Sequence, residues 1–130
     1  MPKIFTSKTQ KRGETGEEIA VLYLKNKGFK ILDRNYTRKW GEIDIVALKN
    51  QEIHFIEVKA VVIKDNRTGS ERIQPEENMH PAKLLKLQRT VETYLIEKKA
   101  YDKKWTIDLL CVSFDPGQMI ADVKMYFNIV

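Results

Sequence analysis

Three charged residues stand out in this chain of 130 residues because they lie in otherwise apolar segments: Asp44, Glu57 and Lys59. Asp44 belongs to Gly-Glu-Ile-Asp-Ile-Val-Ala and the other two to Phe-Ile-Glu-Val-Lys, and both segments have the composition of strands. Charged side chains seldom occupy strand interiors unless they are paired or hold a metal ion. Two carboxylates with an ammonium group could bind a divalent cation and activate water, which is the chemistry of phosphodiester hydrolysis.

The turn between these two segments decides whether the three side chains meet. A two-residue hairpin turn at 50–51 would place Asp44 opposite Glu57. In the same register, Glu42 would lie opposite Lys59. Directly opposed side chains share a face, with Cβ atoms about 4.5–5.5 Å apart, whereas a slip of one residue would separate the two acids. The sequence therefore predicts a shared site if this turn forms, and none if the register slips.

A divalent cation would relieve the repulsion between the two acids. Two carboxylates this close repel by roughly 1 kcal/mol in water and by about 3–4 kcal/mol at the effective dielectric near a protein surface. With Mg²⁺ held by Asp44 and Glu57, Lys59 would orient or deprotonate the attacking water and stabilise the pentacovalent state. The alternative is a plain ion pair between Glu57 and Lys59 on the surface of an edge strand.

Further candidate residues lie on the predicted helices and turns. Glu17 could assist metal binding from the first helix, although an acid in a first turn also complements the helix dipole. Candidate phosphate contacts are Arg38 and Lys39 in a basic turn, and Lys83 and Lys86 on the second helix. For the two helical lysines, a solvated basic face is the alternative.

Other reactive or aromatic side chains are interpreted as structural. His54 alternates onto the face opposite Glu57 without an evident partner, and Trp40 is expected to pack rather than to stack on bases. Cys111 is expected in the core, and as the single cysteine it excludes an internal disulfide and a zinc-type cluster. Because the sequence has no membrane-spanning apolar run and no secretory segment, we expect a cytoplasmic protein without a membrane partner.

The pattern of apolar residues, glycine and proline predicts a helix, three strands, a helix and two strands. Thr15 is expected to cap the first helix and Gly28 to end it. Apolar residues occupy both faces of the central strands, with Ile43 on the side of Ile45, so helices should cover both sides of the sheet. The fold class is therefore α/β, a mixed central sheet flanked by helices. The expected strands are 29–36, 42–48, 53–63, 107–114 and 119–127, the second helix is 81–99, and 64–80 is a long loop.

The charge distribution favours a nucleic-acid partner without proving one. The chain has a net charge of +5, and residues 1–12 contain four basic and no acidic residues. We expect these residues to form a flexible basic arm in front of a single domain, 13–130. Such arms release condensed counterions when they bind nucleic acids, although they also occur on ordinary soluble proteins.

Several motifs together resemble the bacterial YraN-like family. This family in turn resembles archaeal Holliday-junction resolvases and the wider restriction-endonuclease-like superfamily. The resemblance covers about residues 13–114, and its most specific part is Gly-Glu-Ile-Asp followed by Glu-Val-Lys. The motifs are Gly13-x-x-Gly16-Glu17-x-x-Ala20, Gly28-Phe29, Ile31-Leu32, Asn35-Tyr36, the segments 41–47 and 55–59, Lys83, Tyr94-Leu95 and Ile107-Asp108-Leu109-Leu110.

The resemblance implies a restriction-endonuclease-like core with a Mg²⁺- or Mn²⁺-dependent site. Asp44, Glu57 and Lys59 match the catalytic positions of the superfamily, and Glu17 matches its helical acid. Relatives often carry an arginine two places after the lysine, where this chain has Val61, so the resemblance does not extend to that phosphate contact.

Three functions remain possible at this point. The first is a DNA endonuclease acting on branched DNA in repair or recombination. A symmetric junction would require a homodimer of this protein. The second is a non-catalytic nucleic-acid-binding module. The third is an interaction subunit of a DNA-processing complex.

Overall fold

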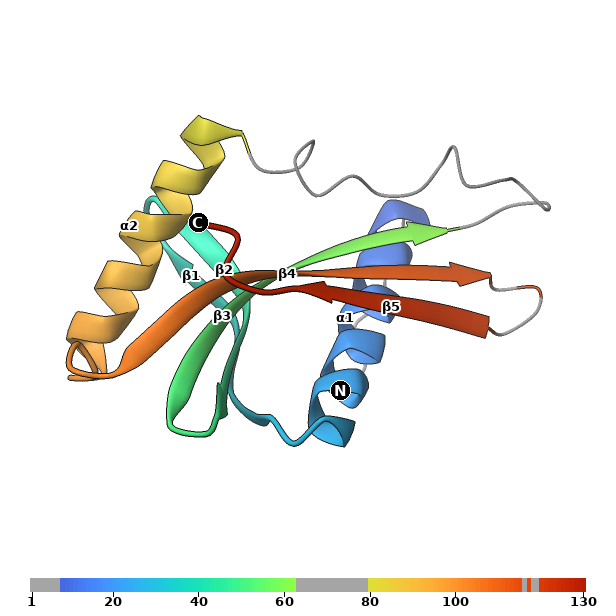
Figure 1. The fold of residues 1–130 in the computed structure, drawn as a ribbon. Coiled ribbons are helices and arrows are strands. Elements are labelled where there is room, and N and C mark those ends of the chain that lie inside the picture. Colours follow the sequence, from blue (N-terminus) through green and yellow to red (C-terminus); the bar gives the residue numbers. More distant parts are fainter. Residues whose placement is uncertain (1–7, 63–79, 116, 118–119) are drawn as a thin grey trace, which may run out of the picture.

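The order of elements is the one predicted from the sequence. The structure is a computed structural model that describes residues 8–62, 80–115, 117 and 120–130 (Figure 1). The predicted loop 64–80 lies outside these residues, except for its last position. The elements are α1 (Lys8–Asn26), β1 (Lys30–Arg38), β2 (Gly41–Lys49), β3 (Glu52–Val62), α2 (Pro81–Glu97), β4 (Lys104–Asp115) and β5 (Ile120–Tyr126).

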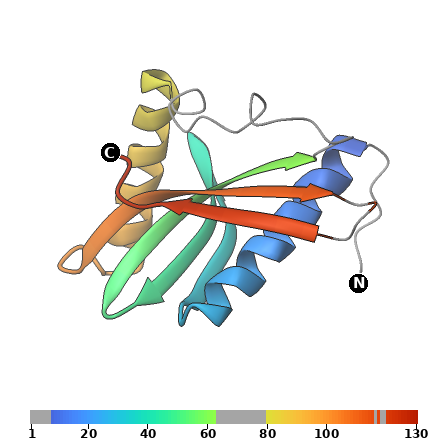
Figure 2. The ribbon, with the colours of Figure 1, turned by 45° about the vertical axis from the view of Figure 1, so that its right-hand side comes forward.

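The strands form one mixed sheet in the order β1-β2-β3-β4-β5. β3 and β4 run parallel, and the other neighbours are antiparallel. The connection from β3 to β4 includes α2, because parallel neighbours require a crossover. The predicted α/β class with a mixed sheet flanked by helices is thus confirmed, as Figures 1 and 2 show.

Each helix packs on its own side of the sheet, as the two-sided apolar strands predict. The α1 core consists of Ala20, Val21, Leu24, Phe29, Ile45, Ala47, Ile56, Leu110 and Val112. The α2 core consists of Tyr36, Ile43, Val46, Ile53, Phe55, Leu87, Val91, Tyr94, Leu95, Ala100 and Ile107. Neither helix, over its described length, is long and apolar enough to cross a membrane.

The regular alternation of β2 breaks at Asp44. Ile43 and Val46 both belong to the α2 core, whereas Ile45 between them belongs to the α1 core. The predicted grouping of Ile43 with Ile45 is therefore wrong. One extra residue in the strand switches the side to which the preceding residues point, which is the effect of a β-bulge.

The neighbouring strand β1 has an irregularity at the same level. Asn35 has a φ of 53°, in the left-handed region that side chains rarely adopt. It falls opposite Asp44, between the flanking cross-strand pairs of β1 and β2. Asp33 and Tyr36, three residues apart, both point toward α2, where both contact Tyr94. The two strands therefore bend together at this level.

The first helix begins earlier than predicted. It starts at Lys8 rather than at a cap on Thr15. The preceding residues include helix-favouring lysine, glutamine and arginine and no proline, so nothing stops the helix at Thr15. The last residues of the predicted basic arm are thus helical, and residues 1–7 lie outside the described part. A Cβ atom on Gly16 would clash with the Cβ of Ala60, so this glycine permits close contact between α1 and β3.

A buried pair of polar residues ties the sheet to the C-terminal segment. The sequence offered no partner for His54, but Nδ1 of His54 donates to Oδ2 of Asp108 at 2.6 Å. Asp108 is fully buried, and its second oxygen accepts the backbone N–H of Asn128 at 2.9 Å. The His54 ring contacts Phe29 and Phe127 edge-on. These contacts agree with the structural role expected of His54 and supply the partner that was not evident in the sequence.

We expect Asp108→Asn to lower the free energy of unfolding by about 1.5–3 kcal/mol, because it weakens two hydrogen bonds to a buried charged group while keeping the shape. Urea denaturation of the variant and of wild type measures this. Asp122→Asn, at an exposed position of β5, is the control and should change stability little. Equal stability of all three proteins would contradict the structural role of Asp108.

Candidate active site

The hairpin between β2 and β3 forms with the predicted turn and register. Asn50 and Gln51 have φ values of 51° and 64°, as a two-residue type I′ turn requires. The strands then pair regularly from Lys49–Glu52 to Ile45–Ile56. This is the register that brings Asp44 to the level of Glu57.

The ladder between β2 and β3 ends one residue before the predicted pair of acids. There, Oδ2 of Asp44 accepts the backbone N–H of Val58 at 2.8 Å. The carboxylate therefore takes a hydrogen bond from the neighbouring strand at the point where β2 bends. The predicted pair of Glu42 with Lys59 does not form, because the ladder with β3 stops at Ile45–Ile56, whereas Glu42 stays paired with Thr37 of β1. Beyond Asp44, the start of β2 therefore pairs with β1 alone.

Asp44 lies in an environment that opposes its ionisation. Burial, followed by repulsion from Glu57, raises its pKa from 3.8 to about 7. The hydrogen bond from Val58 lowers this pKa, and the charges of Glu17 and Glu42 raise it further. Carboxylates from α1, β2 and β3 thus all act electrostatically on Asp44. A positive charge at this point would relieve the repulsion.

Glu57 and Lys59 lie on the side of β3 that faces away from α1. Val58 between them packs on the α1 core, and β3 continues as a regular strand through this segment. Nζ of Lys83, at the start of α2, lies 2.9 Å from Oε1 of Glu57. Lys59 is exposed. One of the predicted phosphate contacts, Lys83, is therefore an ion-pair partner of the candidate site.

Glu17 lies in the middle of α1 and not in its first turn. The helix-dipole interpretation of Glu17 therefore no longer applies, because that effect is confined to the ends of a helix. Its side chain is 23% exposed, and Oε2 lies 3.9 Å from Nη2 of Arg34. Arg34 makes a closer ion pair, at 2.9 Å, with Glu18. Glu17 thus acts on Asp44 through its charge while it also contacts β1.

Asp44 and Glu57 are the residues that could hold a divalent cation. Hard cations such as Mg²⁺ take carboxylate and backbone carbonyl oxygens, and Mg²⁺ keeps several waters. Asp44 and Glu57 would supply two carboxylates, and the backbone carbonyl of Val58 is a further candidate ligand. Within the described part of the chain, no group of three or more His, Cys, Asp or Glu side chains is close enough to hold a metal ion. Glu17 as a third ligand stays a prediction.

The predicted nucleic-acid contacts on the β1–β2 hairpin differ in their surroundings. Nε and Nη2 of Arg38 donate to the Glu97 carboxylate at 2.9 and 2.6 Å, and its guanidinium lies over the Tyr36 ring. The hydrogen bonds from Arg38 and Tyr36 lower the pKa of Glu97 to about 2. Arg38 thus joins the hairpin to the end of α2. Lys39, at the tip of the hairpin, is exposed.

Packing by Trp40, as the sequence predicts, agrees with the structure. Its Nε1 donates to Oγ1 of Thr93 at 3.2 Å, and the Arg89 guanidinium lies 4.3 Å from the centre of the ring. Gly41 follows directly, and a Cβ atom there would lie 2.8 Å from Oγ1 of Thr90. These contacts fix the start of β2 against α2. Lys86, the remaining predicted phosphate contact, is exposed on that helix.

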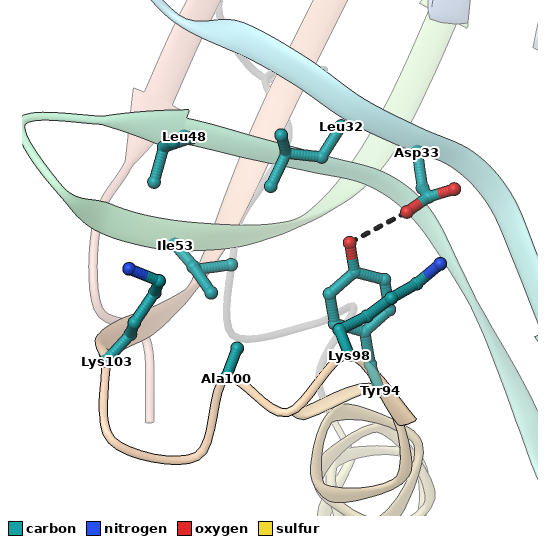
Figure 3. A pocket seen from close by; sticks show the side chains of 8 residues that line it. All are labelled: Leu32, Asp33, Leu48, Ile53, Tyr94, Lys98, Ala100 and Lys103. Carbon is teal, nitrogen blue, oxygen red and sulfur yellow. Dashed lines mark hydrogen bonds between the residues drawn. The ribbon is translucent and has the colours of Figure 1, made fainter. Parts of the chain in front are cut away.

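A separate pocket of about 350 Å³ lies between β1, the β2–β3 hairpin and the end of α2 (Figure 3). Tyr94 donates to Oδ2 of Asp33 at 2.7 Å along one wall. Burial and this hydrogen bond raise the pKa of Tyr94. Lys98 and Lys103 also line the pocket. None of the candidate site residues lines it, and local spacing could not predict it because it combines three distant segments.

The fold and the site together define a mixed α/β protein in which a bent central hairpin carries two carboxylates and a lysine. Residues 16–115 match the uncharacterised protein family UPF0102. The chain therefore belongs to this family, which is the YraN-like family predicted from the sequence.

Relatives from several bacteria are similar over most of their length. The UPF0102 protein of Campylobacter lari is 40% identical over 117 residues, which cover 90% of this chain and 91% of that protein. The UPF0102 protein of a Sulfurovum species is 36% identical over 126 residues, which cover 96% of this chain and 97% of that protein. The UPF0102 protein of Thermotoga maritima is 45% identical over 83 residues, which cover 64% of this chain and 69% of that protein.

Proposed function

We propose that this protein is a metal-dependent endonuclease that hydrolyses DNA phosphodiesters, with branched DNA in repair or recombination as its substrate. The observation that carries the proposal is Asp44. Its carboxylate accepts the Val58 N–H at a bend in β2, and burial, followed by repulsion from Glu57, raises its pKa to about 7. A bound cation would relieve this repulsion, so the raised pKa of Asp44 supports a metal-binding role.

Each residue of the candidate site would have its own role in hydrolysis. Asp44 and Glu57 would hold Mg²⁺ or Mn²⁺, which when bound would supply a Lewis acid for the phosphoryl oxygen and lower the pKa of its water. The Val58 N–H fixes the orientation of the Asp44 carboxylate. The ammonium group of Lys59 would orient the attacking water and stabilise the developing negative charge.

Lys83 has a second role in this proposal. Its ammonium group neutralises Glu57 at 2.9 Å. Once a cation occupies the acid pair, Lys83 would be released toward a phosphate of the substrate. The likeness of the Gly-Glu-Ile-Asp and Glu-Val-Lys motifs to those of the restriction-endonuclease-like superfamily supports the same roles.

A cleavage panel tests the proposal. Purified protein should cut a four-way junction or a flapped substrate in Mg²⁺ or Mn²⁺, and EDTA should stop the reaction. Linear and nicked duplexes of the same sequence measure the preference for branched DNA. Absence of cutting on all four substrates with both metals would contradict the nuclease assignment.

The Lys83–Glu57 ion pair also favours a second candidate function, a non-catalytic nucleic-acid-binding module. In this alternative, Lys83 permanently supplies the positive charge that the acid pair needs. Salt-sensitive DNA binding would then persist without cleavage, and calorimetry would detect no Mn²⁺ binding.

A further inference from the structure

Two lysines flank the single cysteine of the chain in a row across three strands. Lys59 of β3 is paired with Cys111 of β4, and Cys111 is paired with Lys124 of β5. Both lysines are exposed, whereas Cys111 is buried. The row begins two residues after Glu57, at the candidate active site.

All three residues lie on the side of the sheet that faces away from α1. Their chain neighbours Val58, Leu110 and Val123 pack in or against the α1 core. Because side chains alternate along a strand, Lys59, Cys111 and Lys124 point to the other side. Lys59 and Lys124 thus belong to one surface although they are far apart in the sequence.

The charges of both lysines affect the pKa of the Cys111 thiol. Burial raises its pKa to about 11, and the positive charges of Lys59 and Lys124 act in the opposite direction. The two ammonium groups therefore act on the same region between β3 and β5, which agrees with the strand register.

We propose that Lys59 and Lys124 bind the sugar–phosphate backbone of a nucleic-acid strand that crosses β3, β4 and β5 away from Glu57. The inference rests on the proposed function, because it gives the path of the substrate beyond the candidate active site. It also adds Lys124 of β5 to the predicted nucleic-acid contacts, which the sequence analysis placed in the β1–β2 hairpin and on α2.

The spacing of the two lysines suits such a strand. Neighbouring strands of a sheet lie about 4.7–4.9 Å apart, so the backbones at Lys59 and Lys124 are roughly 10 Å apart. One strand of B-form DNA rises about 3.4 Å per nucleotide. Because the phosphates also wind around the helix axis, their spacing exceeds this rise, and the two lysines would contact phosphates one or two nucleotides apart. Asp122, on the same side of β5 as Lys124, is expected to limit the surface at that end.

Binding measured in EDTA tests the path independently of cleavage. A fluorescein-labelled four-way junction is titrated with protein at several salt concentrations. Lys124→Ala should weaken binding by roughly three- to tenfold near physiological salt and should lower the slope of log K against log salt by about 1. Lys124→Gln, which keeps the length of the side chain better, should behave in the same way.

Two control variants show whether a change in affinity comes from the proposed surface or from the net charge of the protein. Lys103→Ala removes an exposed lysine between α2 and β4 and should leave affinity and slope unchanged. Asp122→Asn removes an acid from the proposed surface and should strengthen binding. Thermal unfolding should show that all variants are folded as wild type.

The outcomes distinguish this inference from the nuclease proposal. If no metal supports cleavage but Lys124→Ala still weakens binding, the nuclease assignment fails and the nucleic-acid path stands. If Lys124→Ala and Lys103→Ala bind equally and with equal slopes, the path across β5 is overturned, whatever the cleavage panel shows.

Discussion

Asp44→Ala and Lys59→Ala should each abolish DNA cleavage, with a loss of at least about 10²–10³-fold in rate. Asp44 is the acid for which a cation would provide the missing positive charge, and Lys59 is the exposed ammonium group on the same strand as Glu57. Single-turnover cleavage of the preferred branched substrate, with Mn²⁺ and protein in excess, measures both effects.

Two controls make this result specific. Asp44→Asn keeps an oxygen that can accept the Val58 N–H but removes the charge, so it should be as inactive as Asp44→Ala if the carboxylate binds metal. Lys103→Ala should cut at the wild-type rate. Cleavage at the wild-type rate by Asp44→Ala or Lys59→Ala would mean that a contaminating nuclease, and not this site, performs the reaction.

Asp44→Asn should stabilise the protein at pH 8 by up to about 4 kcal/mol. The pKa of Asp44 is raised from 3.8 to about 7, so the folded protein binds this proton more tightly than the unfolded chain does. The resulting contribution to stability is complete below pH 3.8 and is lost as the pH rises through 7. Asparagine stays neutral at every pH and therefore avoids that loss.

Urea denaturation of wild type and Asp44→Asn at pH 4, 6 and 8 checks this prediction. The difference in unfolding free energy should be near zero at pH 4 and should increase with pH. Adding Mn²⁺ at pH 8 should stabilise wild type but not the variant, since a ligand that binds only the folded state raises its stability. A variant less stable than wild type at pH 8 would show that the Asp44 charge already has a partner.

The local features of the site could be predicted from the sequence because they depend on neighbours in the chain. The two-residue turn at Asn50 and Gln51 and the apolar strands around it set the register of β2 and β3. The same alternation correctly places helices on both sides of the sheet. The bend at Asp44 could not be predicted, because β2 is apolar on both sides and a switch of sides therefore leaves no break in its hydrophobic pattern.

Sequence patterns could not predict most partners of the charged side chains. His54 and Asp108 are 54 residues apart, and Arg38 and Glu97 are 59 residues apart. Such pairs form only after the strands and α2 have packed. For the same reason the ion pair between Lys83 and Glu57 could not be predicted, and the phosphate contact of Lys83 stays a prediction.

The bend shared by β1 and β2 suggests why Asp44 is present at all. Asn35 and Asp44 face each other, and each adds one residue to a strand whose flanking residues already point to the correct sides. The apolar residues on either side of this pair already pack on both surfaces of the sheet. The core therefore does not require the aspartate, and packing alone gives no reason to retain an acid that opposes its own ionisation.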